Sequence, residues 1–76
     1  MTKYTQMIDT SGLNCPLPIL KARKQLNALE SGEILYIVAT DSGSAKDFDA
    51  FCKQTGHSLL DSSEDEGKYH YYIRKS

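Results

Sequence analysis

The side chains of the segment EILYIVAT, residues 33–40, are apolar almost without interruption, and several are β-branched. Successive side chains of a strand point to opposite faces, so a continuous apolar run needs cover on both faces, at least in part. Residues 33–40 therefore predict a central strand, and the rest of the chain must supply the elements that cover it.

Upstream of this strand, apolar side chains recur at helical spacing. The pattern begins after Pro16, polar residues fill the other faces, and Gly32 stands where a C-terminal cap is expected. The apolar positions are Ile19, Ala22, Leu26 and Leu29. They predict a first amphipathic helix with one buried face.

Downstream, a second helix is expected to begin at Ser44. Ser44 and Asp47 have the spacing of a helix-start box, with Asp in place of the usual Glu, and Gly56 is expected to end the helix. Its buried face is expected to carry Phe48, Phe51, Cys52 and Thr55. Cys52 is therefore predicted to be a core residue.

Three further strands are expected at residues 4–9, 57–62 and 68–74, the last two joined by the polar segment SEDEG. The order β-α-β-α-β-β predicts a two-layer α/β sandwich of the α+β kind, a four-stranded mixed sheet with both helices on one face. The first two strands are parallel if they are neighbours, because crossovers are right-handed. The opposite face of the sheet is expected to be partly exposed to solvent, which suits tyrosines because of their hydroxyls. The candidates for this face are Tyr36, Tyr69, Tyr71 and Tyr72.

The composition fits one small domain spanning residues 1–76. The chain is 39% hydrophobic and 25% charged, with a formal net charge of −1, unlike disordered chains. Neither half is basic enough for direct nucleic-acid binding through phosphate neutralisation. No apolar run approaches the ~20 residues of a membrane span, and MTKYTQMIDT has no apolar signal-peptide region. We therefore expect a cytoplasmic location without membrane association.

Cysteines in a reducing compartment stay unpaired, so Cys15 needs its own explanation. Pro16 fits the first helical position, because its missing N–H would be unpaired there. Cys15 is then the N-cap, where the helix dipole lowers the thiol pKa. Pro18 removes a second donor and leaves an alternative, a helix that starts at Pro18 with Leu17 as its cap. We expect a moderately activated Cys15 on a rigid segment.

Two interpretations of Cys15 stay open. It caps or packs the helix, as many buried free cysteines do, or it is a reactive thiol, which its boundary position and the flanking Gly12 favour. No metal site is expected, because the cysteines and histidines lack metal-ligand spacing, and no cofactor motif is found. A reactive cysteine without base, metal or cofactor suits a carrier better than a complete catalyst.

The motif Asp9-x-x-Gly12-x-x-Cys15-Pro16-x-Pro18 resembles the signature of the TusA/SirA-like sulfur-carrier family. The likeness continues through SGEILYIVATD, DFDAFCKQTGH and YHYYIRK, and so covers nearly the whole chain. The resemblance implies a two-layer α/β sandwich, in agreement with the order of the elements.

The resemblance also implies a sulfurtransferase-type carrier without a cofactor. Cys15, the cysteine of the CPxP motif, would accept sulfane sulfur as a persulfide from a cysteine desulfurase or a rhodanese-like donor. It would then relay the sulfur to an acceptor protein, toward tRNA 2-thiouridine or dissimilatory sulfur oxidation. Leu17 within the motif is more typical of the oxidative branch, and the motif assigns no sulfur to Cys52.

Lys21, Arg23 and Lys24 are expected on the exposed face of the first helix behind Cys15, where they steer an acidic partner or form an ordinary solvated face. The alternative function is a regulatory or interaction domain with a structural Cys15, because small α/β sandwiches serve many purposes. A thiol peroxidase or disulfide oxidoreductase would need Cys52 as the resolving cysteine, and its expected burial argues against this.

Overall fold

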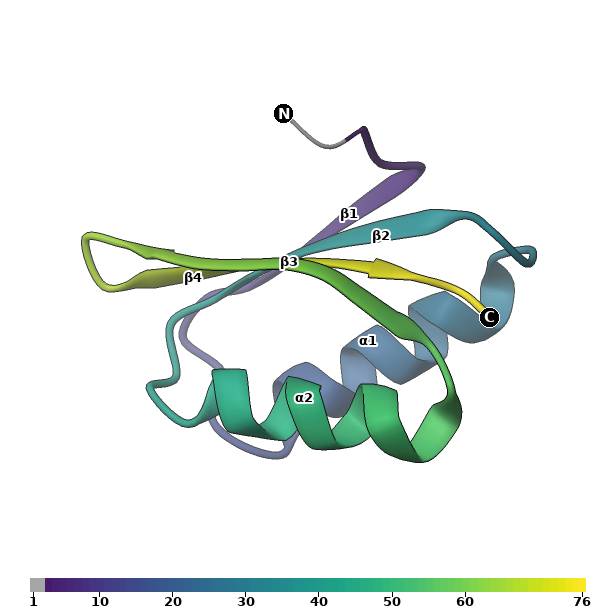
Figure 1. Cartoon of the computed structure of the whole chain (residues 1–76). Helices are drawn as coiled ribbons and strands as arrows, with labels where there is room; N and C mark the ends of the chain where they lie inside the picture. The colour runs from purple at the N-terminus through teal and green to yellow at the C-terminus, as the bar shows by residue number, and fades with distance from the viewer. Residues whose placement is uncertain (1–2) are drawn as a thin grey trace.

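The structure, a computed structural model, describes residues 3–76. Its elements are β1 (Gln6–Thr10), α1 (Leu17–Ala28), β2 (Ile34–Ala39), α2 (Ser44–Thr55), β3 (Ser58–Asp65) and β4 (Lys68–Arg74). Figure 1 shows the sheet as one layer and the two helices as a second layer on one of its faces. The predicted order of elements and the two-layer sandwich are confirmed.

The sheet has the strand order β1-β2-β4-β3, so β2 is an inner strand, as predicted. β2 is parallel to β1 and antiparallel to β4, and β3 pairs antiparallel with β4 at the far edge. The parallel pair follows from the crossover through α1. Because β1 and β2 run in the same direction, the loops that follow them leave the sheet at the same end.

The core lies between the helices and the sheet. Its buried members are Ala22, Leu26, Leu29, Leu35, Ile37, Ala39, Phe48, Phe51, Cys52, Tyr71 and Ile73. Helical spacing in α1 and α2, and alternation in β2 and β4, bring these side chains to one interior. The buried faces of the helices are the predicted ones, except that Thr55 is exposed.

Ser44 does not cap α2. The N-cap is Gly43, without a side-chain capping hydrogen bond, whereas the buried Ser44 hydroxyl lies 2.6 Å from the Tyr71 hydroxyl and hydrogen-bonds with it. A buried hydroxyl without a partner destabilises a fold, so Ser44 satisfies Tyr71 instead of the helix end. The helix begins at the predicted residue, but the predicted capping role is wrong.

The two glycines predicted to end the helices behave differently. Gly56 ends α2 with a φ of 84°, and its N–H donates to the Cys52 carbonyl. α1 ends earlier than predicted, and its C-cap Leu29 has an extended backbone and a buried side chain. Gly32 belongs to the turn before β2, where its N–H donates to the Lys75 carbonyl, so its predicted capping role is wrong.

Two strand boundaries also differ from the predicted ones. β1 begins later than predicted and includes Thr10, whose buried hydroxyl donates to the Val38 carbonyl at 2.7 Å. β3 continues to Asp65 because it pairs with β4 as far as the hairpin turn, with an irregularity between Leu59 and Asp61. Hydrogen bonds to residues distant in sequence set both strand boundaries, and no local sequence pattern predicts such bonds.

The face of the sheet away from the helices carries an aromatic cluster. Tyr36 stacks on Tyr72 with ring centroids 4.6 Å apart, and its hydroxyl hydrogen-bonds His70 Nδ1 at 2.6 Å. Burial in this cluster raises the pKa of Tyr36. Tyr71 instead points into the core and Tyr69 packs against it, because neighbouring residues of a strand face opposite sides. The tyrosines therefore divide between the two faces.

Candidate functional site

Cys15 lies in the loop between β1 and α1, with its thiol exposed. This loop meets the loop that follows β2 at the carboxyl ends of the two parallel strands. The Gly12 N–H donates to Thr40 Oγ1 at 2.8 Å, and the Cys15 N–H donates to Asp41 Oδ2 at 3.2 Å. These bonds tie the backbone of the cysteine segment to its neighbour, so the thiol has a defined position.

α1 begins at Leu17, between the two predicted starts. The Pro16 carbonyl accepts the first helical hydrogen bond, from the Leu20 N–H at 3.1 Å, which makes Pro16 the N-cap. The Leu17 N–H donates to the Asn14 carbonyl at 2.8 Å. Cys15 therefore precedes the cap, and the helix has no side-chain capping bond. The predicted N-cap role of Cys15 is wrong.

The electrostatics of Cys15 also differ from the prediction. A hydrogen bond to the Asp47 carboxylate raises the pKa of the Cys15 thiol, and desolvation and the charges of Asp47 and Asp41 raise it further. Negative charge beside a thiol disfavours the thiolate. The two carboxylates therefore shift the pKa of the Cys15 thiol in the direction opposite to the predicted activation.

Beside the thiol, α1 and α2 form a shallow groove of about 260 Å³. Ile19 and Arg23 of α1 line it opposite Asp47 and Phe51 of α2. Ile19 and Arg23 share this side because residues four apart lie on one helix face. The groove thus places the Cys15 thiol between a guanidinium, a carboxylate and apolar walls, open to solvent. This arrangement suits side chains of a protein partner.

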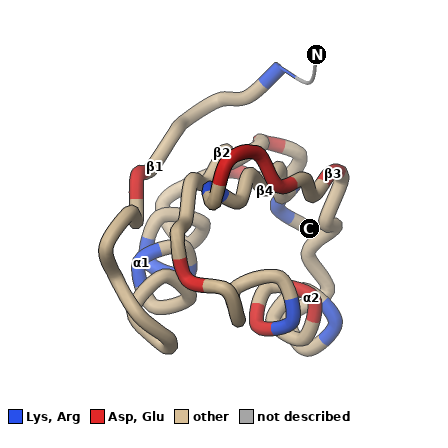
Figure 2. The backbone as a smooth tube through the Cα atoms, turned by 90° about the vertical axis from the view of Figure 1, so that its left-hand side faces the viewer, with Lys and Arg blue, Asp and Glu red and all other residues tan. Residues whose placement is uncertain are grey.

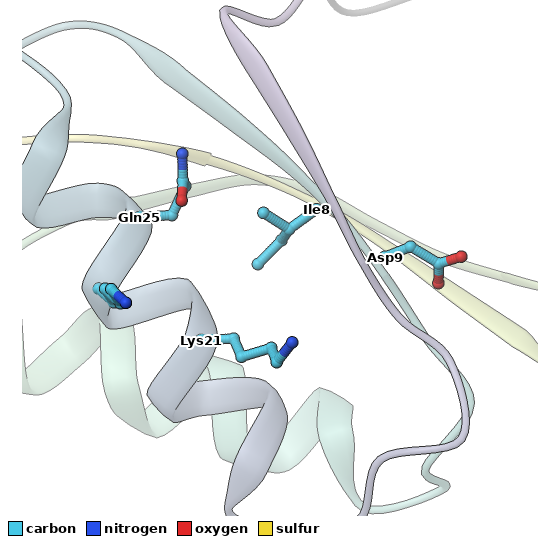
Figure 3. Close-up of a pocket in the computed structure, with 5 residues that line it drawn as sticks. Ile8, Asp9, Lys21 and Gln25 are labelled. Atoms are coloured by element: carbon cyan, nitrogen blue, oxygen red, sulfur yellow. The ribbon is translucent and has the colours of Figure 1, made fainter.

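The three basic residues predicted to steer a partner separate onto two sides of α1, whose basic positions are blue in Figure 2. Arg23 lines the groove beside Cys15. Lys21 and Lys24 line a different groove, between α1 and β1 (Figure 3). At about 100° per residue, Arg23 points nearly opposite to Lys21. The fold therefore brings only Arg23 to the cysteine.

The remaining motif residues shape the segment around Cys15. Asp9 Oδ1 accepts the Ser11 N–H at 2.9 Å, and hydrogen bonds from Ser11 lower the pKa of Asp9. Gly12 has a φ of 82°, a left-handed conformation that favours glycine. Pro18 is buried in the first turn of α1. These residues build the turn and the helix start on either side of Cys15.

Comparison with known proteins identifies the family. The family model described as sulfurtransferase TusA matches residues 6–75. This chain belongs to the TusA family. It is 59% identical over 76 residues to the sulfur carrier protein TusA of Allochromatium vinosum, with 100% of both chains covered. It is 39% identical over 77 residues to the sulfur carrier protein TusA of Pseudomonas putida, covering 99% of this chain and 96% of that protein.

The fold of this TusA-family chain also occurs in a solved structure. The crystal structure of a SirA-like protein from Desulfitobacterium hafniense superposes with a TM-score of 0.82 at 24% identity, covering 92% of this chain and 96% of that one. The family predicted from the CPxP motif is confirmed, and with it the role of a sulfur carrier that works with partners in a relay.

Sequence reasoning missed two site residues of this TusA-family chain, Asp41 and Asp47. Asp41 directly follows the predicted central strand, and polar residues at the carboxyl ends of parallel strands commonly border sites. That signal could have identified it. Asp47 is assigned by its local pattern to a helix-start box, and no spacing relates it to Cys15. Only the packing of α2 beside the cysteine loop reveals its role.

The second cysteine has a different environment. Cys52 is buried, as predicted, and burial together with the charge of Asp49 raises its pKa to about 11. Both its burial and this raised pKa disfavour a thiolate at Cys52. Within residues 3–76, no three histidine, cysteine, aspartate or glutamate side chains are grouped to hold a metal ion. Neither helix of that part of the chain is long and apolar enough to cross a membrane.

Replacing Asp47 by asparagine is expected to activate Cys15. The substitution removes the carboxylate that raises the thiol pKa, so the thiolate fraction at pH 7 rises and alkylation becomes severalfold faster. The measurement is the rate of iodoacetamide alkylation against pH, with peptide mapping to separate Cys15 from Cys52. Asp49→Asn is the matched control, because Asp49 pairs with Lys53 on the same helix. Identical pH profiles for Asp47→Asn and the unsubstituted chain would contradict the assignment.

Proposed function

We propose that this TusA-family chain carries sulfane sulfur as a persulfide on Cys15. The observation that supports this most strongly is the exposed thiol at an open groove, with its backbone held by Asp41, while the other cysteine is buried. A carrier needs a sulfur atom that two proteins reach in turn, and Cys15 meets this requirement. The alternative of a structural Cys15 has less support, because Cys15 neither caps α1 nor packs in the core.

Loading is an exchange between sulfur atoms. The Cys15 thiolate attacks the outer sulfur of a persulfide on the donor, a new S–S bond forms on Cys15, and the donor cysteine leaves as a thiolate. In delivery, the acceptor thiolate attacks the outer sulfur of the Cys15 persulfide, and Cys15 leaves as a thiolate. Each step breaks one S–S bond and forms another, so no external oxidant or reductant is consumed.

Asp41 and Asp47 make this exchange dependent on a partner. In the free protein their charges favour the protonated Cys15 thiol. A partner that places a basic side chain beside these carboxylates offsets their charge and lowers the thiol pKa within the complex. The nucleophilic thiolate then forms where the donor persulfide is present, and the free carrier is protected from stray electrophiles.

The donor is a cysteine desulfurase or a rhodanese-like protein, and the acceptor is another relay protein of the cytoplasm. Leu17 and Leu20, at 47% and 51% exposure, offer apolar contact near the cysteine, and Arg23 adds a positive charge. The sulfur enters tRNA 2-thiouridine or dissimilatory sulfur oxidation. Offering the loaded carrier to acceptor proteins of each pathway, and following loss of the sulfur, distinguishes the two.

Intact-protein mass measured without reductant tests the proposal. After incubation with a cysteine desulfurase and cysteine, or with a rhodanese and thiosulfate, we expect a gain of one sulfur atom that reductant removes. Peptide mapping is expected to place this atom on Cys15. An unmodified protein with both donors, or sulfur on Cys52 alone, would overturn the proposal and favour an interaction domain.

A further inference from the structure

A second groove, about 420 Å³ in volume, lies between α1 and β1. Its walls are Ile8 and Asp9 of β1 and Lys21, Lys24 and Gln25 of α1 (Figure 3). Helical spacing places the lysines on the side of α1 opposite to the groove beside the cysteine. A molecule in this groove would therefore leave the thiol accessible.

The β1 side of the groove is the edge of the sheet. β1 pairs with β2, and no strand within residues 3–76 pairs with its other side. The Thr5 N–H points toward β2 and donates to the Ile34 carbonyl at 2.7 Å. Backbone groups alternate sides along a strand, so the N–H and C=O groups of Gln6 and Ile8 point away from β2, toward the open edge of the sheet. Such an edge can accept an additional strand.

The α1 side of the groove is basic. Lys21 and Lys24 are exposed, and neither forms a salt bridge with any carboxylate of residues 3–76. Asp9 does not neutralise them, because Figure 3 shows its side chain directed away from α1 and its Oδ1 accepts the Ser11 N–H. Ile8 points from β1 toward α1 and supplies apolar surface between the two walls (Figure 3). The groove thus combines free backbone groups, apolar surface and two unpaired cations.

We propose that this groove binds an extended acidic segment of a protein partner, which adds to β1 as a fifth strand. The backbone of that segment pairs with Gln6 and Ile8. Every second side chain of the added strand faces the helix layer, where carboxylates meet Lys21 and Lys24. This surface is separate from the sulfur site, so it holds a partner while Cys15 exchanges sulfur.

The test uses a ten-residue capped peptide of alternating valine and glutamate, titrated into the full ¹⁵N-labelled chain carrying Cys15→Ser. The substitution makes the result independent of the proposed sulfur chemistry. We expect chemical-shift changes and slowed hydrogen exchange at the Gln6 and Ile8 amides. We expect Lys21→Glu with Lys24→Glu to weaken binding roughly tenfold or more, because two attractions become repulsions. Lys46→Glu and Arg23→Glu are the matched charge reversals outside the groove, and they are expected to have little effect.

Strand addition has a second, backbone-specific test. Gln6→Pro removes an outward N–H at an edge position where proline is tolerated, and it is expected to weaken binding. Gln6→Ala controls for loss of the side-chain hydrogen bond between Gln6 and Gln25. The proposal is overturned if the peptide fails to bind, if the lysine reversals leave its affinity unchanged, or if the Gln6 and Ile8 amides stay unprotected. Self-association of the chain through β1, detected by sedimentation, would also overturn it by making a second copy the occupant.

Discussion

Replacing Cys15 by serine is expected to reduce sulfur loading to background. A hydroxyl does not form a persulfide, and the only other cysteine of the chain, Cys52, is buried with a pKa of about 11. Thiolate character and access both govern sulfur exchange, and Cys52 lacks both. The measurement is intact mass without reductant after incubation with each sulfur donor.

Cys52→Ala is the matched control, and it is expected to keep most of the loading if the chain stays folded. Cys15 is exposed, and its side chain makes no capping hydrogen bond. The Cys15→Ser substitution is therefore expected to change the free energy of unfolding of the protein by less than about 0.5 kcal/mol. Circular dichroism and urea unfolding of both variants separate lost chemistry from lost structure. Loading of Cys15→Ser at the level of the unsubstituted chain would exclude Cys15 as the carrier residue.

Replacing Phe48 by alanine is expected to destabilise the fold by about 3–5 kcal/mol. The Phe48 side chain is fully buried, and its ring packs against that of Tyr71 with centroids 4.7 Å apart. A chain of 76 residues has a total stability of only roughly 4–11 kcal/mol. The substitution therefore removes a large part of the stability, and the urea midpoint is expected to fall accordingly.

Leu20→Ala provides the control for side-chain truncation. Leu20 is 51% exposed on α1, and alanine is a strong helix former, so the midpoint is expected to move little. If Phe48→Ala does not fold, Phe48→Leu replaces it in the test, because leucine retains much of the apolar volume. The loss of stability in Phe48→Leu is expected to be smaller. Equal midpoints for Phe48→Ala and Leu20→Ala would show that Phe48 does not hold the two layers together.

The fold was predictable because several strong patterns agreed. The almost continuous apolar run at residues 33–40 indicated a central strand with cover on both faces. The helical spacing of Leu26 with its neighbours, and of Phe48 with Phe51, gave the buried faces of α1 and α2. Each pattern arises from side-chain periodicity, which a residue shares with its immediate neighbours. Such information is present in the sequence itself.

Three capping predictions failed for a common reason, whereas Gly56 ends α2 as predicted. The Ser44 hydroxyl, Gly32 and Cys15 were each assigned to a helix end by local spacing. In the structure, Ser44 bonds Tyr71, and Gly32 bonds Lys75. Cys15 lies before the cap and bonds Asp41 through its N–H. In each case the partner is distant in sequence, so local spacing could not reveal it.

Local patterns in the sequence were enough to predict the order of the elements, the central strand and the family. They also indicated which cysteine lies at a boundary and which lies in the core. The electrostatic surroundings of the Cys15 thiol and the division of the basic residues between two grooves depend on the folded structure. Parallel pairing of β1 with β2 brings Asp41 to the cysteine, and the packing of α2 brings Asp47. Electrostatic interactions depend on distance through space. The distances from Cys15 to these carboxylates exist only after the chain has folded.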